Sequence, residues 1–263
     1  MPSHPEKPTP HLPKRLGFFL TLVVVGLLLA VPRPARAYPL LLWPSSLTSP
    51  GTGLVVPFVF VSGDVKTLNP YLYGAVGLSE RFDIIAGASG VFGLSPASAS
   101  FGLVDVSARY LATPELALTP RILYTPGQSL VVSPELHATR SFGNLMLTLN
   151  AGVRPMLDLN GGGLTSATGF AYLSGSYFLS KQLWLVLEAD PSVTFARGTD
   201  TAGSSWSASV LLAPGVGFAL NPEQTHIFEL AALVSLPTSA PFQYATSVTY
   251  ALWYATSFTL WEK

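Results

Sequence analysis

The chain has 263 residues, of which only 11% are charged, against about 25% in a typical soluble domain. Residues 1–37 hold five of the 14 basic and one of the 14 acidic residues, so the remainder has a net charge of −4, which excludes a strongly basic nucleic-acid-binding surface. The absence of cysteine excludes disulfides and thiolate metal sites, and only His137 and His226 follow residue 37, so we expect no metal and no cofactor.

The first 37 residues have the organisation of an export signal. Lys14 and Arg15 form a basic region, an apolar run follows from Leu16 to Val31, and Ala35-Arg36-Ala37 is a small-x-small cleavage motif. The alternative is a retained membrane anchor, but the apolar run is short for a spanning helix. We therefore predict a signal peptide over residues 1–37, cleaved after Ala37.

Beyond the signal, residues 38–53 are rich in proline and serine and are expected to form a periplasmic N-terminal segment before a barrel over residues 54–263. Short runs of alternating apolar and polar residues then recur to the end of the chain, which is typical of β-strands. Twelve strands are predicted, at Leu54–Val61, Tyr71–Leu78, Phe82–Val91, Phe101–Leu111, Leu116–Tyr124, Leu130–Thr139, Leu145–Arg154, Thr168–Leu179, Leu183–Thr194, Trp206–Phe218, His226–Ser235 and Ser247–Trp261.

The hairpin at residues 129–155 shows the alternation best. Every second residue from Leu130 to Ala138 and from Leu145 to Val153 belongs to one uniformly apolar face. The charged side chains of Glu135 and Arg154, with His137, all belong to the other face. Because successive side chains point to opposite sides of a strand, one face meets an apolar medium and the other a polar one. This is the pattern of a transmembrane antiparallel up-and-down β-barrel in an outer membrane, with an apolar outside and a polar lumen.

Connection lengths agree with this topology. Short turns follow the even-numbered strands, and longer loops mostly follow the odd-numbered ones, as at residues 62–70, 92–100 and 156–167. Outer-membrane barrels have short periplasmic turns and longer outer loops, so both termini are expected in the periplasm. Tyrosines and tryptophans near strand ends, namely Tyr71, Tyr110, Tyr124, Trp206 and Trp253, are expected to form aromatic girdles.

Prolines disturb the predicted strands. Pro57, Pro120, Pro134, Pro191 and Pro214 all fall within them, and each removes one donor from a sheet ladder. Pro191 and Pro214 are predicted to lie at bulges near the outer rim. The sequence gives no comparable explanation for Pro120 and Pro134.

The segment from Tyr73 to Gly87 reads strand, tight turn, strand. It resembles the repeating unit of bacterial outer-membrane barrels, including transporters associated with the degradation of aromatic compounds. The resemblance implies a porin-like barrel inserted by the barrel-assembly machinery, with outer-membrane lipid around it. One departure is the C-terminus, because many such barrels end on an aromatic residue, whereas here Glu262 and Lys263 follow Trp261.

Alternation places a set of ionisable side chains on the inner face. An open lumen lined by them would set a preference for particular solutes or ions, whereas a network of ion pairs among them would plug a narrow barrel. Both readings stay open from the sequence. The predicted lumen-lining residues are Asp83, Asp105, Arg109, Arg121, Glu135, His137, Arg154, Glu188, Asp190 and Glu229.

Catalytic chemistry is weakly supported. His137 with Ser133, Thr139 and Asn150 could form a nucleophile, base and orienting group, as in outer-membrane phospholipases. Alternation turns these side chains inward rather than toward lipid, so we predict no catalytic residues and no enzyme. The expected function is passive passage of small solutes. The alternatives are a plugged barrel that acts through its loops, an acyl hydrolase and a soluble secreted β-sandwich.

Overall fold

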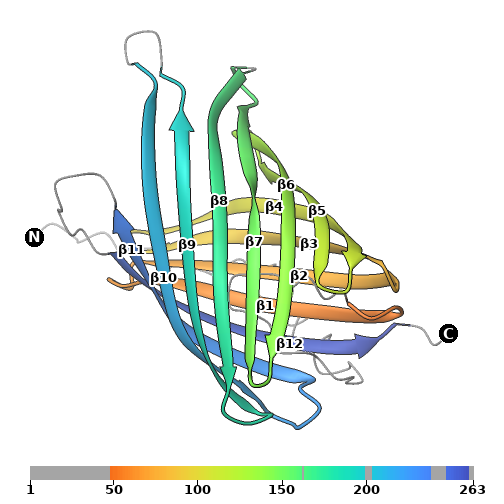
Figure 1. The fold of residues 1–263 in the computed structure, drawn as a ribbon. Helices are drawn as coiled ribbons and strands as arrows, with labels where there is room; N and C mark the ends of the chain where they lie inside the picture. Colours follow the sequence, from red (N-terminus) through yellow and green to blue (C-terminus); the bar gives the residue numbers. More distant parts are fainter. Residues whose placement is uncertain (1–47, 162, 199–202, 238–246, 261–263) are drawn as a thin grey trace, which may run out of the picture.

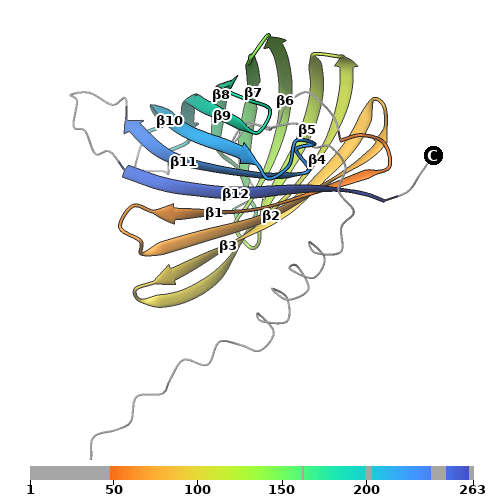
Figure 2. The same cartoon turned by 90° about the horizontal axis from the view of Figure 1, so that it is seen from below.

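The computed structural model describes residues 48–161, 163–198, 203–237 and 247–260. Twelve antiparallel strands close into one barrel, in which each strand pairs with its sequence neighbours and β1 pairs with β12 (Figures 1 and 2). The predicted fold class and strand number are therefore confirmed. The strands are β1 Thr52–Ser62, β2 Thr67–Ser79, β3 Phe82–Leu94, β4 Ala97–Thr113, β5 Leu116–Thr125, β6 Ser129–Phe142, β7 Leu145–Asp158, β8 Gly163–Phe178, β9 Leu183–Ala196, β10 Ser205–Ala219, β11 His226–Pro237 and β12 Ser247–Thr259.

Parts of the chain with predicted roles lie outside the described residues. They include the signal peptide over 1–37 with its cleavage site, most of the 38–53 segment, and the C-terminal Trp261–Lys263. Within the described part of the chain, no helix is long and apolar enough to cross a membrane.

The barrel has two distinct ends. The turns after β2, β4, β6, β8 and β10 lie at one end, which we call the short-turn end, and we call the opposite end the loop end. Thr52 at the start of β1 pairs with Thr259 at the end of β12, so the strand pairs begin and finish at the short-turn end. At the turn between β6 and β7, Gly143 has a φ of 58°, a left-handed conformation that glycine adopts without strain.

Three predicted long loops are wrong, because most of their residues belong to strands. The predicted loop at 92–100 shrinks to Ser95-Pro96 between β3 and β4, and the loops at 62–70 and 156–167 shrink in the same way. Pairing continues through them, for example between Phe92 and Ala99. Glycine- and serine-rich stretches look like loops in the sequence, but a hairpin ladder holds them extended.

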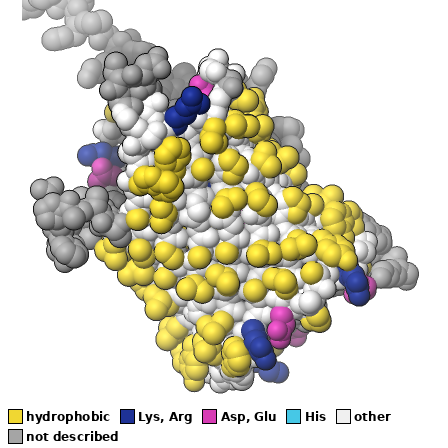
Figure 3. Space-filling view, turned by 45° about the horizontal axis from the view of Figure 1, so that its top comes forward, with side chains coloured by type: hydrophobic (Ala, Val, Ile, Leu, Met, Phe, Trp, Pro, Cys, Tyr) yellow, Lys and Arg dark blue, Asp and Glu magenta, His cyan; other side chains and the backbone are white. Residues whose placement is uncertain are grey.

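The two faces of the wall differ in composition. Leu136, Leu173 and Leu187 are about half exposed on the outside, whereas their neighbours His137, Ser174 and Glu188 are buried inside. Figure 3 shows hydrophobic side chains spread across the outer wall, with charged side chains gathered toward its edges. An apolar belt of this kind matches the hydrocarbon of a bilayer.

Each strand proline leaves a gap in one ladder only. Pro120 and Pro134 face each other across β5 and β6. The register of β4 with β5 skips from Ser107 to Tyr110, opposite Pro120, and that of β6 with β7 skips from Val131 to Glu135. In an antiparallel strand, the N–H and C=O of one residue point to the same neighbouring strand. A proline therefore loses backbone hydrogen bonds to the strand on one side and stays paired with the strand on its other side. This explains the two prolines that the sequence left unexplained.

The interior is apolar along one side. Residues of β1, β2, β11 and β12, among them Leu54, Val56, Ile227 and Leu233, form most of a buried cluster that extends to Trp184 on β9. Tyr71 stacks on Phe58 with ring centroids 4.7 Å apart, and Trp253 is buried. The prediction that Tyr71 and Trp253 belong to the outer girdles is therefore wrong, because both rings pack inside the barrel. Tyr110, Tyr124 and Trp206 are exposed on the outer wall.

The chain just before β1 turns into the barrel. Thr48 is buried, and its backbone N–H donates to Asp83 Oδ2 at 2.8 Å. Gly51 N–H donates to the carbonyl of Gly77 at 3.0 Å. Pro50 and Gly77 form an isolated parallel β-bridge. β1 begins at Thr52, two residues before the predicted start of the barrel.

Candidate functional site in the barrel interior

Of the ten ionisable residues predicted for the lumen, eight are buried, and the partly exposed Arg121 and Arg154 are paired with buried carboxylates. Seven of the ten form ion pairs and hydrogen bonds across β3 to β7, in two groups that we together call the ion-pair chain: Asp83 with Arg109, and Asp105 with Arg121, Glu135, His137 and Arg154. The other three, Glu188, Asp190 and Glu229, lie on β9 and β11 and are here called the acidic group.

The ion-pair chain begins near the short-turn end with Asp83 and Arg109. These residues are direct partners across β3 and β4. Arg109 donates from Nε to Asp83 Oδ1 at 2.9 Å and from Nη2 to Oδ2 at 2.5 Å, and both side chains are fully buried. With the Thr48 N–H as a third donor to this carboxylate, the pair is held in place from two strands and the N-terminal segment.

A second pair lies one step further toward the loop end. Arg121 on β5 forks onto Asp105 on β4, with Nε 2.9 Å from Oδ1 and Nη2 in close contact with Oδ2. Tyr73 on β2 donates its hydroxyl to the same carboxylate at 2.6 Å. The Asp105 carboxylate therefore connects the aromatic side of the interior to the ionic side.

Glu135 on β6 is the hub at the far end of the chain. It accepts from Arg154 Nη2 at 3.0 Å and from Ser133 Oγ at 2.9 Å, and Arg121 lies 3.7 Å away. The Arg154 guanidinium also lies over the ring of Phe170, 4.0 Å from its centroid, and donates to the hydroxyl of Tyr172 at 3.1 Å. Aromatic and carboxylate contacts together fix the plane of this arginine.

The hydrolase hypothesis requires a hydroxyl within hydrogen-bond distance of the His137 imidazole. The group at that distance is a carboxylate instead. His137 Nε2 lies 3.1 Å from Glu135 Oε2, and the Ser133 hydroxyl donates to Glu135 Oε1. Thr139 Oγ1 lies 3.2 Å from Thr148 Oγ1. These hydrogen bonds place no hydroxyl nucleophile on the imidazole. The side chains of Ser133, His137, Thr139 and Asn150 belong to the interior rather than to the lipid-facing wall.

The acidic group has a different environment. Trp184 on β9 lies across Gly217 of β10, where an added Cβ would stand 2.1 Å from the indole, and its Nε1 reaches Glu229 Oε1 on β11 at 2.7 Å. All the arginine–carboxylate pairs of the ion-pair chain involve Asp83, Asp105 or Glu135. The ten predicted lumen residues include six acids and three arginines, and the acidic group therefore accounts for the three acids in excess.

Burial decreases along the barrel axis. Arg109, His137, Trp184 and Glu229, in the half nearest the short turns, are 2% exposed or less. Nearer the loop end, the side chains of Arg121 and Arg154 are 18% and 24% exposed. The interior is thus filled at the short-turn end and more accessible from the loop end.

Part of the polar interior has no protein partner. Buried polar atoms without a hydrogen bond in the described chain include His137 Nδ1, Asn150 Oδ1, Ser174 Oγ, Ser176 Oγ and Asp190 Oδ1. They lie on β6 to β9, which are consecutive in the wall. Further atoms of this kind lie on β1, β5, β11 and β12. Buried polar groups are almost always bonded to protein or to water, so these positions in the interior favour water. Among the described residues, no group of three or more His, Cys, Asp and Glu side chains is arranged to hold a metal.

Several contributors to the site were not among the ten residues predicted to line the lumen. Tyr73, Tyr172 and Ser133 complete hydrogen bonds of the ion-pair chain, and Thr48 does so through its backbone. Alternation in the sequence places Ser133 on the inner face. Tyr73 and Tyr172 have the same signal, but a tyrosine fits either face of a membrane strand, so alternation alone does not assign it a role.

Comparison with known proteins identifies the fold. No protein-family model and no curated protein matches the chain. Among solved structures, an outer-membrane channel from Pseudomonas putida F1 aligns with a TM-score of 0.57 at 10% identity, covering 81% of this chain and 98% of that one. The NanC porin aligns with a TM-score of 0.52 at 7% identity, covering 77% and 98%. At this identity the likeness concerns the fold, and the chain has the fold of an outer-membrane β-barrel.

Proposed function

We propose that this barrel lies in the outer membrane and is a passive channel for small solutes, with a weak preference for cations. The observation that carries the proposal is the polar side of the interior. On β7 to β9, oxygens of Asn150, Ser174, Ser176 and Asp190 have no hydrogen bond within the described part of the chain, and the ionisable residues of the interior include an excess of acids. An interior built only for packing would not retain polar atoms that require water.

Export and assembly are part of this proposal. The signal peptide over 1–37 would be cleaved after Ala37, and the barrel-assembly machinery would insert the mature chain into outer-membrane lipid. Mass spectrometry of the envelope protein should find Tyr38 at its N-terminus. A mature chain that retains Leu16–Val31 would refute the cleavage.

The second candidate is a plugged barrel whose loops carry the function. It is favoured by the filled short-turn end, where Asp83, Arg109 and Trp184 are fully buried and Thr48 adds a backbone contact. The two candidates differ in whether small molecules cross the interior. In the channel, this end is the narrowest part of the path.

Liposome swelling separates the two. We expect refolded protein in vesicles to admit small neutral sugars, and Trp184→Ala to speed swelling because it removes the largest fully buried side chain at the narrow end. Trp206→Ala is the matched control, since Trp206 is 72% exposed on the outer wall. Both variants must first show the heat-dependent gel shift of a folded barrel. If neither the wild type nor Trp184→Ala makes vesicles swell faster than empty vesicles, the channel is refuted and the plugged barrel is favoured.

A further inference from the structure

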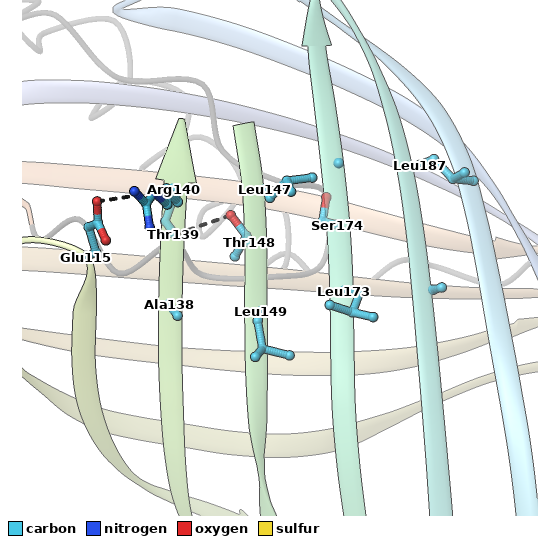
Figure 4. A pocket seen from close by; sticks show the side chains of 12 residues that line it. Glu115, Ala138, Thr139, Arg140, Leu147, Thr148, Leu149, Leu173, Ser174 and Leu187 are labelled. Carbon is cyan, nitrogen blue, oxygen red and sulfur yellow. Dashed lines mark hydrogen bonds and ion pairs between the residues drawn. The ribbon is translucent and has the colours of Figure 1, made fainter. Parts of the chain in front are cut away.

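A groove runs across the outer face of β6 to β9 in the half nearest the short turns. Its volume is about 530 Å³, and Leu147, Leu149, Leu173 and Leu187 form its walls. All four leucines are exposed on the outside of the barrel. Figure 4 shows them beside a polar pair at one edge, formed by Glu115 and Arg140.

The hollow arises from small residues placed beside the leucines. Gly175 pairs with Leu147 on one side and Leu187 on the other, and Ala189 pairs with Leu173. A Cβ added to Gly175 would have only leucine side-chain atoms near it, the closest 3.5 Å away. Because neighbouring strands are about 4.8 Å apart, three strand-to-strand steps give a groove about 14 Å across. An apolar hollow of this size on the belt fits hydrocarbon chains.

The polar edge lies at the level of the membrane interface. Arg140 stands two residues before the end of β6, and Glu115 lies in the turn between β4 and β5. Phe142 and Tyr177, exposed at the same end of the barrel, are residues of the kind that mark an interface girdle. The Arg140 guanidinium lies 5.3 Å from the Phe142 ring centroid, which holds it beside the belt.

The charges of this edge are mixed. Arg140 Nε is 3.8 Å from Glu115 Oε1, and the two side chains are 66% and 58% exposed. They form a loose surface pair, in which both groups can accept a second partner. A ligand with a phosphate and an ammonium close together would satisfy both, whereas a purely anionic headgroup would meet the Glu115 carboxylate.

We propose that this groove binds one phosphatidylethanolamine molecule of the periplasmic leaflet. An acyl chain lies among the leucines over Gly175, the phosphate accepts from Arg140, and the ammonium donates to Glu115. The leaflet follows from the short-turn end, which is periplasmic in barrels of this type. The proposal depends on the barrel being in the membrane but not on whether its interior conducts.

Native mass spectrometry of the full barrel tests this site. Phosphatidylethanolamine or phosphatidylglycerol with the same acyl chains is added to the protein in detergent. The wild type should retain one phosphatidylethanolamine in preference to phosphatidylglycerol. Arg140→Gln should lower the apparent affinity about tenfold, the value of one charge-assisted hydrogen bond. Glu115→Gln should remove the preference between the two lipids.

Two matched controls separate this site from general lipid contact. Lys181→Gln removes a cation from another turn at the same end, outside the groove lining. Gly175→Leu fills the hollow and should abolish retention, whereas Gly169→Leu, on the same strand with open space around it, should not. If Gly175→Leu fails to fold, the comparison of Arg140→Gln with Lys181→Gln still shows whether the lipid binds at this groove.

Four outcomes would overturn the proposal. The first is equal retention of the two lipids by the wild type. The second and third are equal losses of phosphatidylethanolamine retention in Arg140→Gln and Lys181→Gln, or in Gly175→Leu and Gly169→Leu. The fourth is a lipid-free dimer that Gly175→Leu disrupts. The last outcome would assign the groove to a second copy of the chain. Swelling of vesicles is unaffected by any of them, so failure here is distinct from failure of the channel.

Discussion

Asp83 and Arg109 are fully buried, and each satisfies the other's charge through two hydrogen bonds. Removing one member of such a pair leaves a charge without compensation in the interior, which costs about 3–5 kcal/mol. We therefore expect Arg109→Ala to lower the free energy of unfolding by that amount. Urea titration in lipid vesicles, followed by tryptophan fluorescence, measures the change.

The surface pair of Arg140 and Glu115 provides the control at this scale. Both side chains are more than half exposed, so Arg140→Ala should change stability by less than about 1 kcal/mol. The double variant Asp83→Asn with Arg109→Met buries no charge and should recover part of the loss. Similar losses for Arg109→Ala and Arg140→Ala would contradict the burial of the Asp83–Arg109 pair.

At the scale of the strand, the two faces should respond differently to charge. Leu173 on β8 is 52% exposed on the outer wall, whereas Ser192 on β9 shares the inner face with Glu188 and Asp190. An arginine that faces lipid costs about 2–4 kcal/mol at mid-membrane and less toward the interface, whereas an inner position in the more accessible half tolerates it.

Leu173→Arg should therefore reduce the yield of folded barrel in lipid, and Ser192→Arg should leave it near the wild-type level. The gel-shift assay of folding gives both yields. A larger loss for Ser192→Arg would place the lipid on the opposite face of the wall.

Strand number and facing could be predicted from the sequence because the two-residue period is a local signal. It placed Glu135, Arg154 and Glu188 on the inner face without knowledge of any partner. Extended hairpins at the loop end were missed, since glycine and serine lower strand propensity locally while ladder pairing acts between strands.

The pairing of the site residues could not be predicted in the same way. Arg109 meets Asp83 because the two are opposite in the register of β3 and β4. A shift of one residue would turn every side chain to the other face, so partner choice requires the register itself. The contact of Thr48 with Asp83 depends in addition on where a proline- and serine-rich segment enters the barrel, which periodicity does not encode.

For the whole molecule, the interior is divided by chemistry. β1, β2, β11 and β12 contribute aliphatic and aromatic packing, β3 to β7 contribute paired ions, and β9 with β11 contributes the acidic group. The arginines are engaged with Asp83, Asp105 and Glu135, so the excess acids set the sign of the field for an ion in a hydrated path.

The reversal potential of single channels in a planar bilayer, under a potassium chloride gradient, tests the charged and hydrated interior most directly. We predict a potential of the sign for cation preference, which weakens at high salt as screening increases and at low pH as carboxylates are protonated. Glu188→Gln with Asp190→Asn should shift it toward anions. The absence of any conductance, or an anion preference in the wild type, would contradict a water-filled path lined by the acidic group.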